Sequence, residues 1–315
     1  MKTCASLFTG CGGWEWGARQ LGIKPLWGVE FNADYGPVYE ANFPGAHLHL
    51  GDVKKAKPAQ FKAPDFLFCS PPCQGHSEAR NTRGLENRGD EGVGIEVLKF
   101  AAAYVGKGTR ILIENVPEYL DHEIFHEIME GLEGMGYTTS AGVYDASDYG
   151  CPSDRPRMLA WACSKATVAE TMRRSAQATP DWWPVIEDLV RREPPSELAG
   201  WQLENLIHVP PPSYPVIIVG GNATRWAEKG KPGRRVWRVA GRAAPAIVKA
   251  KSQSGARVLV EPNYAVKMTP RMAARLMGFS DDFWLPNEKG AALDVVGNAV
   301  PPPLAVAALK ALGVR

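Results

Sequence analysis

Short apolar runs alternate with amphipathic stretches over the first 163 residues. The apolar runs predict strands at 4–8, 26–30, 47–50, 65–69, 110–114, 137–144 and 158–163. The stretches between them predict helices at 14–21, about 35–42, 95–105 and 125–135. Strands that alternate with helices are typical of a mostly parallel sheet covered by helices on both faces. We therefore expect an α/β fold with a doubly wound sheet in this part of the chain.

The pattern changes after Cys163. Residues 165–265 are rich in Pro, Trp and Arg and show little periodicity, which predicts a separate, small and irregular β-rich domain. Regular structure resumes where Thr269-Pro270 predicts the start of a helix, and a last helix is expected at about 304–312. The expected domains are therefore 1–164 and 165–265, followed by a C-terminal segment, 266–315, that returns to complete the first domain.

Composition limits the possible classes of protein. The chain has 315 residues, 45% hydrophobic and 22% charged, which allows one large core and a smaller second one and excludes disorder. Six cysteines are too few for a disulfide scaffold, and no pair has C-x-x-C spacing, so we expect reduced thiols and no metal. Gly10 interrupts the first apolar run before a signal sequence could form, and no window approaches a membrane span. We expect a cytoplasmic, monomeric protein without a membrane partner.

The charge is unevenly distributed. The formal net charge is only +2, which by itself indicates neither a nucleic-acid nor a membrane partner. Residues 222–257, however, hold ten Lys and Arg residues against the single acid Glu228, a net charge of +9, so that the remaining residues sum to −7. One short segment is thus strongly basic on a mildly acidic chain.

A glycine-rich turn, Gly10-Cys11-Gly12-Gly13, follows the first predicted strand and leads into a helix. Such turns in parallel sheets bind nucleotide-like ligands, although many are only tight strand-to-helix connections. Glu15 stands where the dinucleotide fingerprint needs a third glycine, which disfavours nicotinamide and flavin dinucleotides. Two acids, Glu30 and Asp52, end later predicted strands and suit a ribose and an adenine amino group. We therefore expect a nucleoside cofactor without a pyrophosphate.

A thiol and an acid follow two further strands. Cys73 comes directly after Pro71-Pro72, which would present its sulfur on a stiff turn, whereas an ordinary surface cysteine is the simpler alternative. Glu114 ends the next strand, in Glu114-Asn115-Val116. The carboxyl ends of parallel strands meet at one edge of a sheet, where α/β active sites form. We expect Cys73 and Glu114 to lie there with the glycine turn.

Six short motifs combine to identify a family. In chain order they are Phe8-x-Gly10-x-Gly12-Gly13, Pro72-Cys73-Gln74, Glu114-Asn115-Val116, Arg155-Pro156-Arg157, Thr269-Pro270-Arg271 through Phe279, and Gly297-Asn298-Ala299-Val300-Pro301. In this combination and order the sequence resembles the S-adenosylmethionine-dependent DNA (cytosine-5)-methyltransferases over nearly its whole length. Only residues 165–265 lack a match, as expected of the variable target recognition domain of that family.

The resemblance implies a role for each matching residue. The cofactor-binding residues would be Phe8, Gly10, Gly12, Gly13, Glu30, Phe31, Asp52, Pro72 and Asn298. Cys73 would add as a thiolate to C6 of cytosine, and Glu114 would stabilise ring N3. Arg155 and Arg157 would contact the base O2 and favour the Cys73 thiolate. For Phe31, core packing is an equally good interpretation.

The resemblance also assigns double-stranded DNA as the partner, with a target cytosine flipped out of the helix. The expected DNA contacts are Arg80, Arg83, Arg225, Arg234, Arg235, Arg238, Arg242 and Arg271. A solvated cationic face or surface loop is the alternative for these arginines. The insert of about 100 residues is small for the family, which suggests a short target of about two to four base pairs.

The sequence departs from the family pattern in places. Ser153 replaces the glutamine of the Q-x-R-x-R motif, Gly75-His76-Ser77 replaces the usual Phe-Ser, and Met272 and Met277 replace common polar residues. Three alternatives stay open: an RNA methyltransferase of the tRNA type, although the Cys-Phe-Thr tripeptide of that branch is absent; a non-catalytic DNA-binding relative; and an enzyme that uses a modified sulfonium donor.

Overall fold

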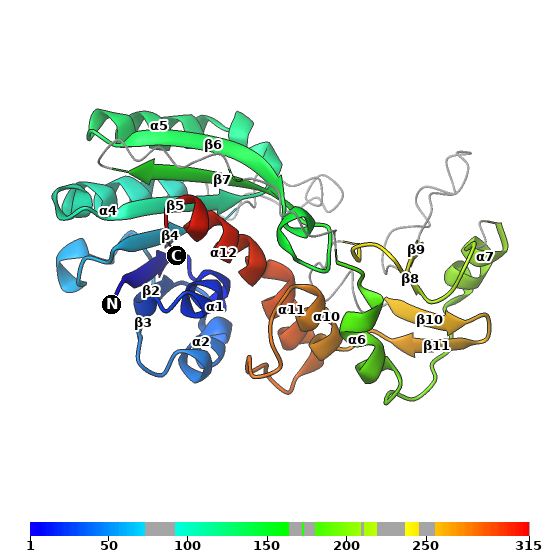
Figure 1. Cartoon of the computed structure of the whole chain (residues 1–315). Coiled ribbons are helices and arrows are strands. Elements are labelled where there is room, and N and C mark those ends of the chain that lie inside the picture. The colour runs from blue at the N-terminus through cyan, green and yellow to red at the C-terminus, as the bar shows by residue number, and fades with distance from the viewer. Residues whose placement is uncertain are drawn as a thin grey trace. The chain divides into compact units, whose positions relative to one another are not determined.

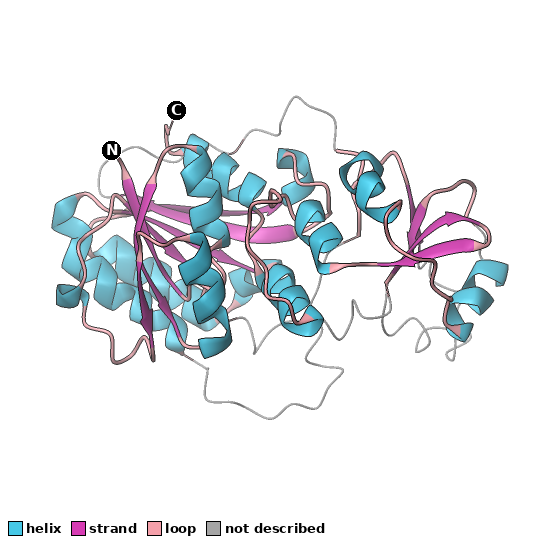
Figure 2. Ribbon diagram, turned by 90° about the horizontal axis from the view of Figure 1, so that it is seen from below, coloured by secondary structure: helices cyan, strands magenta, loops and turns pink. Residues whose placement is uncertain are grey.

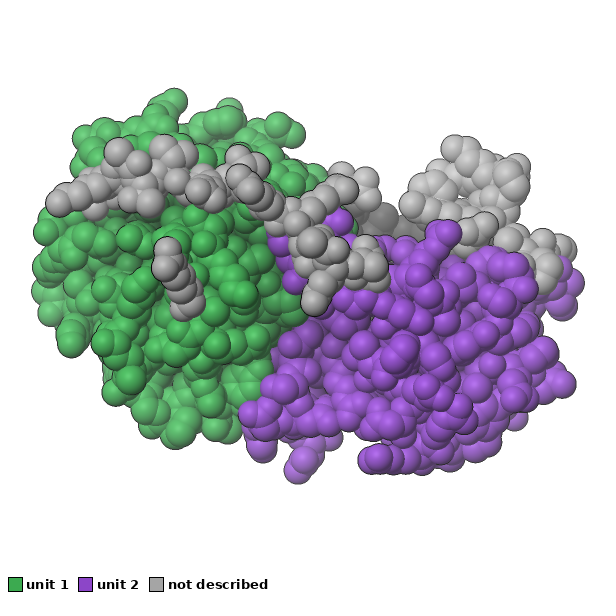
Figure 3. All heavy atoms as spheres, in the orientation of Figure 1, with its two compact units in different colours: residues 1–145, 156–174, 302–315 green, residues 146–155, 175–301 purple. Residues whose placement is uncertain are grey.

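The computed structural model describes residues 1–72, 92–163, 172, 180–208, 211–218, 237–245 and 256–314. The chain forms two compact units (Figure 3). Unit 1 comprises Met1–Asp145, Pro156–Arg174 and Pro302–Arg315, and unit 2 comprises Ala146–Arg155 and Ser175–Pro301. These boundaries differ from the expected domains, because residues 146–155 and 266–301 belong to unit 2 and the chain returns to unit 1 only at Pro302.

A seven-stranded sheet forms the centre of unit 1 (Figure 1). Its strands are β1 (Thr3–Leu7), β2 (Lys24–Glu30), β3 (His47–Leu50), β4 (Phe66–Cys69), β5 (Arg110–Asn115), β6 (Thr138–Asp145) and β7 (Pro156–Cys163). The strand order is β3-β2-β1-β4-β5-β7-β6, with β1 to β5 parallel to one another and β7 antiparallel to both of its neighbours. Every residue of β4 is buried, as expected of a parallel strand with both faces covered. The prediction of a mostly parallel α/β sheet is confirmed.

Helices lie on both sides of this sheet (Figure 2). They are α1 (Gly13–Gln20), α2 (Gly36–Asn42), α4 (Glu96–Tyr104), α5 (Glu123–Gly134) and α12 (Pro302–Ala311), with short 3-10 turns η1 (Ala33–Tyr35), η2 (Pro58–Gln60), η3 (Val93–Ile95), η4 (Val105–Lys107) and η5 (Pro117–Asp121). α1 and α12 approach each other closely at Gly17. A Cβ there would lie 2.7 Å from the Ala305 Cβ and 2.8 Å from the Pro302 carbonyl oxygen. The C-terminal helix therefore supports α1, which follows the glycine turn.

Unit 2 contains a four-stranded antiparallel sheet and four α-helices among its described residues. The strands are β8 (Val216–Ile218), β9 (Trp237–Val239), β10 (Arg257–Glu261) and β11 (Tyr264–Lys267), in the order β11-β10-β8-β9. The helices are α6 (Trp183–Val190), α7 (Gly200–His208), α10 (Pro270–Leu276) and α11 (Lys289–Asn298), with one 3-10 turn, η6 (Ala146–Tyr149). The small β-rich sheet was expected, but α6, α7 and α11 were not. The predicted cap of α10 is confirmed, because the Thr269 hydroxyl accepts a hydrogen bond from Met272 N.

The segment Lys289–Ala311 corrects one expectation from the sequence. It is long and apolar enough to cross a membrane, by length and composition, with a mean hydropathy of 1.4. However, 72% of this window is buried inside the protein, as in helices of a globular core. In addition, the helix is broken, because α11 ends at Asn298 and α12 begins at Pro302.

Candidate active site

The carboxyl edge of the unit 1 sheet collects most of the predicted site residues. The turn Phe8–Gly13 follows β1, Glu30 ends β2, Asp52 follows β3, Pro71 and Pro72 follow β4, and Glu114 lies at the end of β5. Arg157 lies at the same edge because β7 runs antiparallel to β5, which pairs Asn115 with Met158. Cys73 itself lies outside the described residues, as do Arg80 and Arg83.

The glycine turn requires backbone conformations that favour glycine. Gly10 has a φ of 55° and Gly12 a φ of 87°. A Cβ at Gly12 would lie 2.2 Å from the Phe43 ring, so a larger residue does not fit there. At Gly10 a Cβ would meet nothing within 4 Å, so the turn faces open space at this position. Phe8 has a φ of 59° and is, among the described residues, the one non-glycine residue with a positive φ.

Glu30 holds this turn in place. Its carboxylate accepts hydrogen bonds from Gly10 N at 2.7 Å and from Asn32 N at 2.8 Å. Burial raises the pKa of Glu30, and these backbone donors act in the opposite direction. Each carboxylate oxygen can accept a further hydrogen bond, which leaves capacity for a ligand hydroxyl.

Phe31 and Asp52 lie near Glu30 at the ends of neighbouring strands. The Phe31 side chain is 78% exposed, so the alternative of core packing is wrong. An exposed phenylalanine beside a polar strand end is a suitable platform for a ligand ring. Asp52 is half-buried, and its Oδ1 accepts a hydrogen bond from Lys54 N at 2.9 Å.

Glu15, which in the sequence only disfavours a dinucleotide ligand, belongs to the supporting structure of the turn. It is fully buried in the first turn of α1. Its Oε1 accepts hydrogen bonds from the hydroxyls of Ser6, of Thr9 at 2.9 Å and of Tyr39 at 3.3 Å. Among the described residues, Oε2 has no hydrogen-bond partner. The carboxyl group therefore fastens the turn to β1 and α2.

The environment of Glu15 predicts a pH dependence of stability. Burial raises the pKa of Glu15 above its ordinary value of 4.5, and the hydroxyl donors only partly oppose this. As the pH rises above 4.5, the Glu15 carboxyl group loses its proton in the unfolded chain before it does so in the folded protein. The free energy of unfolding should therefore decrease until the pH has passed the raised pKa. Urea denaturation between about pH 5 and pH 8 should show this decrease relative to Glu15→Gln, which does not titrate. Parallel curves for the two proteins would contradict the expectation.

Glu114 is paired with Arg157 across two adjacent strands. The Arg157 Nε lies 3.0 Å from the Glu114 Oε1, and the side chains are only 16% and 9% exposed. The next residue, Asn115, donates a hydrogen bond from Nδ2 to the Pro71 carbonyl oxygen at 3.1 Å. The end of β5 is therefore joined directly to the residues that precede Cys73.

Comparison with known proteins identifies the family. A family model described as C-5 cytosine-specific DNA methylase matches residues 2–313. The chain belongs to this family. It is 25% identical to type II methyltransferase M.NgoPII of Neisseria gonorrhoeae, over 95% of this chain and 92% of that protein. It is 27% identical to M.NgoBI of the same organism, over 98% and 92% of the two chains.

Solved structures of similar fold support the assignment of the architecture. A putative DNA modification methyltransferase encoded within an E. coli prophage superposes with a TM-score of 0.70, at 19% identity and over 99% of both chains. DNMT2 of Spodoptera frugiperda gives a TM-score of 0.68 at 16% identity, over 99% of this chain and 100% of that one. The family match over residues 2–313 shows that the protein is a DNA (cytosine-5)-methyltransferase, and enzymes of this family use S-adenosylmethionine.

The carboxyl edge fits the cofactor of a C-5 cytosine methylase. The open space beside Gly10, the buried carboxylate of Glu30 and the exposed ring of Phe31 suit an adenosyl group. Among the residues that the structure describes, no group of three or more His, Cys, Asp and Glu could hold a metal ion.

Arg155 has a structural contact that the sequence did not indicate. Its side chain is buried in unit 2, and Nη2 donates to the carbonyl oxygens of Gly297 at 2.9 Å and Ala299 at 3.0 Å. Arg155 thereby holds the motif around Asn298, which is exposed at the end of α11. Its contact with the base O2 stays a prediction, as does the contact of Asn298 with the cofactor.

Ser153, which replaces the family's glutamine, is fully buried in unit 2. Backbone hydrogen bonds hold the loop around it. Asp154 N donates to the Ala244 carbonyl oxygen at 2.8 Å, and Ala244 N donates to that of Pro152 at 2.7 Å. Asp154 also forms an ion pair with Arg238 at 2.7 Å. These contacts fasten the loop around Ser153.

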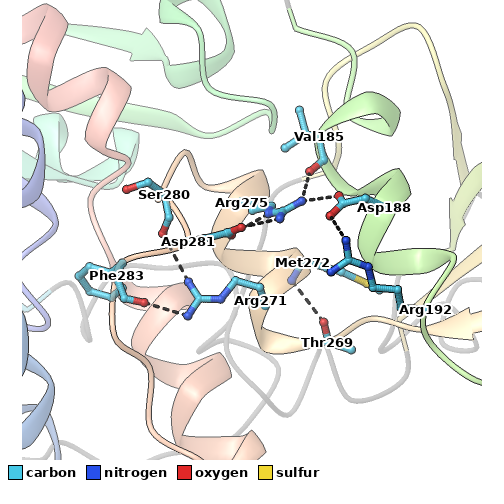
Figure 4. A network of polar contacts seen from close by, with 10 residues as sticks. All are labelled: Val185, Asp188, Arg192, Thr269, Arg271, Met272, Arg275, Ser280, Asp281 and Phe283. Carbon is cyan, nitrogen blue, oxygen red and sulfur yellow. Dashed lines mark hydrogen bonds and ion pairs between the residues drawn. The ribbon is translucent and has the colours of Figure 1, made fainter.

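The arginines expected to bind DNA have different surroundings. Arg271 donates to the carbonyl oxygens of Phe283 at 2.9 Å and Ser280 at 3.4 Å (Figure 4). Arg238 is paired with Asp154, whereas Arg242 is exposed. Arg225, Arg234 and Arg235 lie outside the described residues.

The helix α10 keeps strong polar contacts despite Met272 and Met277, which are both fully buried. Arg275 provides them. Its guanidinium pairs with Asp188 of α6 and with Asp281, each at 2.5 Å, as Figure 4 shows.

Proposed function

We propose that the enzyme methylates C5 of a cytosine flipped out of duplex DNA, through a covalent bond between Cys73 Sγ and C6. One observation supports this most strongly. The hydrogen bond from Asn115 to Pro71 joins the end of β5, which carries Glu114, to the residues that lead into Cys73. A nucleophile and an acid from adjacent strands would then face the same base.

Cys73 would provide the nucleophile. C5 of cytosine is a poor nucleophile, and addition of the thiolate to C6 places an electron pair at C5. After C5 has gained the methyl group, it loses its proton to a base. The electrons of that C–H bond then re-form the C5–C6 double bond and expel the thiolate. Cys73 is regenerated unchanged.

Glu114 and Arg157 would stabilise the pyrimidine during this addition. Negative charge moves onto the ring when the thiolate adds, and Glu114 can supply a proton or a hydrogen bond at N3. The ion pair with Arg157 holds the Glu114 carboxyl group in one orientation. Arg157 would also contact the base O2.

The cofactor would bind at the glycine turn. Glu30 would accept hydrogen bonds from the ribose hydroxyls, Asp52 from the adenine amino group, and Phe8 and Phe31 would flank the adenosyl group. Gly10, Gly12, Gly13 and Pro72 would line the pocket, and Asn298 would hold the methionine end. When bound, S-adenosylmethionine supplies an electrophilic methyl group on a sulfonium.

Unit 2, which includes the basic segment 222–257, would bind the DNA. Arginines such as Arg242 suit contacts with phosphates and with guanine edges, and the basic segment has a net charge of +9. We propose a short target sequence, a monomeric enzyme and a cytoplasmic location.

Methylation of DNA can be tested directly. Purified protein, S-adenosylmethionine with a labelled methyl group and a long unmethylated duplex should give labelled DNA, and bisulfite sequencing should place the modification at C5 of cytosines in one short context. Transfer RNA in a parallel reaction should stay unlabelled. Labelled tRNA with unlabelled DNA would favour the RNA methyltransferase, and DNA binding without any transfer would favour a non-catalytic relative.

A further inference from the structure

Trp14 joins the cofactor turn to the segment that carries the nucleophile. It follows Gly13 in the first turn of α1, and its side chain is 3% exposed. The indole stacks on the Phe68 ring of β4, with ring centroids 4.8 Å apart and planes at 10°. Its Nε1 donates a hydrogen bond to the Ser70 Oγ at 3.1 Å. Ser70 lies three residues before Cys73.

The turn on one side of this link is held by several hydrogen bonds. Trp16 N donates to the Gly12 carbonyl oxygen at 2.8 Å, and Gly12 N donates to that of Thr9 at 3.0 Å. The carboxyl group of Glu15 binds the Thr9 hydroxyl. The backbone at Trp14 is therefore held in place, so that its indole can in turn hold the segment around Ser70.

The segment on the other side is held at two points in addition to Trp14. Ser70 N donates to the Leu7 carbonyl oxygen at 3.3 Å, and the Pro71 carbonyl oxygen accepts from Asn115 at 3.1 Å. Prolines at 71 and 72 restrict the backbone that follows. Only these two prolines, each with a fixed φ, separate Ser70 from Cys73 in the chain.

We propose that Trp14 is a positioning residue that sets the nucleophile relative to the bound cofactor, through its hydrogen bond to Ser70. This inference rests on the proposed role of Cys73. Packing on Phe68 alone would need only an aromatic ring, whereas the indole N–H fixes the orientation of Ser70. The side chain is directed toward Phe68 and Ser70, so its loss should affect the covalent step and not cofactor affinity.

Trp14→Phe tests the hydrogen bond, because phenylalanine keeps an aromatic ring on Phe68 and removes the N–H. The probe is a long duplex in which 5-fluorocytosine replaces cytosine, since fluorine at C5 blocks the final elimination and traps the covalent complex. We expect the variant to form the complex about fivefold more slowly, the usual effect of one lost hydrogen bond. The KM for S-adenosylmethionine and the Kd for S-adenosylhomocysteine should change less than twofold.

Two further variants separate positioning from loss of stability. Ser70→Ala should slow complex formation by the same factor, and the double variant should be no slower than either single one, because both remove one interaction. Trp27→Phe is the matched control. Trp27 is also 3% exposed and also donates from Nε1, to the Lys62 carbonyl oxygen at 2.8 Å. Trp27→Phe should lower the melting temperature of the protein about as much as Trp14→Phe does, and it should leave the rate of complex formation unchanged.

The outcomes distinguish this inference from the proposed function. If the unmodified enzyme forms no covalent complex, the role of Cys73 fails and the inference fails with it. If the enzyme and Trp27→Phe form the complex but Trp14→Phe does so at the unmodified rate, only the inference is overturned. Additive losses in the double variant would also overturn it.

Discussion

Cys73→Ser should lose methyl transfer by at least about 10³-fold while still binding DNA and cofactor. A serine hydroxyl ionises far less readily than a thiol and cannot provide the anion that adds to C6. The five cysteines that the structure describes are poor substitutes, because all of them are buried. Burial raises the pKa of Cys11 to about 12 and raises the pKa of Cys69 as well. No second thiol at this edge should therefore rescue the reaction.

Transfer of a labelled methyl group measures this loss, and gel-shift and calorimetric titrations measure binding of DNA and of S-adenosylhomocysteine. Cys163→Ser is the control. Cys163 is the last residue of β7 and pairs with Thr138, so it lies at the other end of the strands from the candidate active site. That variant should keep its activity. Turnover by Cys73→Ser near the level of the unmodified enzyme would refute covalent catalysis by this residue.

The sequence predicted unit 1 better than unit 2 for a physical reason. In unit 1, glycine turns and acids directly follow apolar runs, and the parallel order of β1 to β5 brings those strand ends together. Local pattern and motif spacing are enough to find such an arrangement. In unit 2, α6 begins at Trp183, with Trp182 as its N-cap. The sequence Trp182-Trp183-Pro184 is typical of a loop, although proline also suits the first turn of a helix.

The contacts between distant segments were not predictable from local pattern. Glu15 gave no sign in the sequence that Ser6, Thr9 and Tyr39 would surround it. The hydrogen bonds of Arg155 to Gly297 and Ala299 join segments more than 140 residues apart. A residue type and its neighbours in sequence do not specify such partners. An acid that closely follows a glycine turn is nevertheless a useful signal in the sequence, because it needs hydrogen-bond partners if the fold buries it.

Glu114→Gln should reduce the rate of methyl transfer by about 10²-fold or more, with little change in the Kd for DNA. Glutamine has nearly the same shape and can still accept a hydrogen bond, but its amide cannot give a proton to ring N3. The substitution also removes the charge that pairs with Arg157 at 3.0 Å. Arg157 would then be a nearly buried cation without its carboxylate, which adds a cost in stability.

The two consequences of Glu114→Gln can be separated. Single-turnover rates report the chemical step, and thermal melting reports the unpaired arginine. A second substitution, Arg157→Gln, should restore part of the melting temperature in the Glu114→Gln background but none of the rate, because it removes the unpaired charge without supplying a proton donor. Glu130→Gln, at an exposed glutamate of α5, should leave both quantities unchanged. If Glu114→Gln kept the rate of the unmodified enzyme, Glu114 would serve only to hold Arg157, and stabilisation of the base would have to come from Arg157 itself.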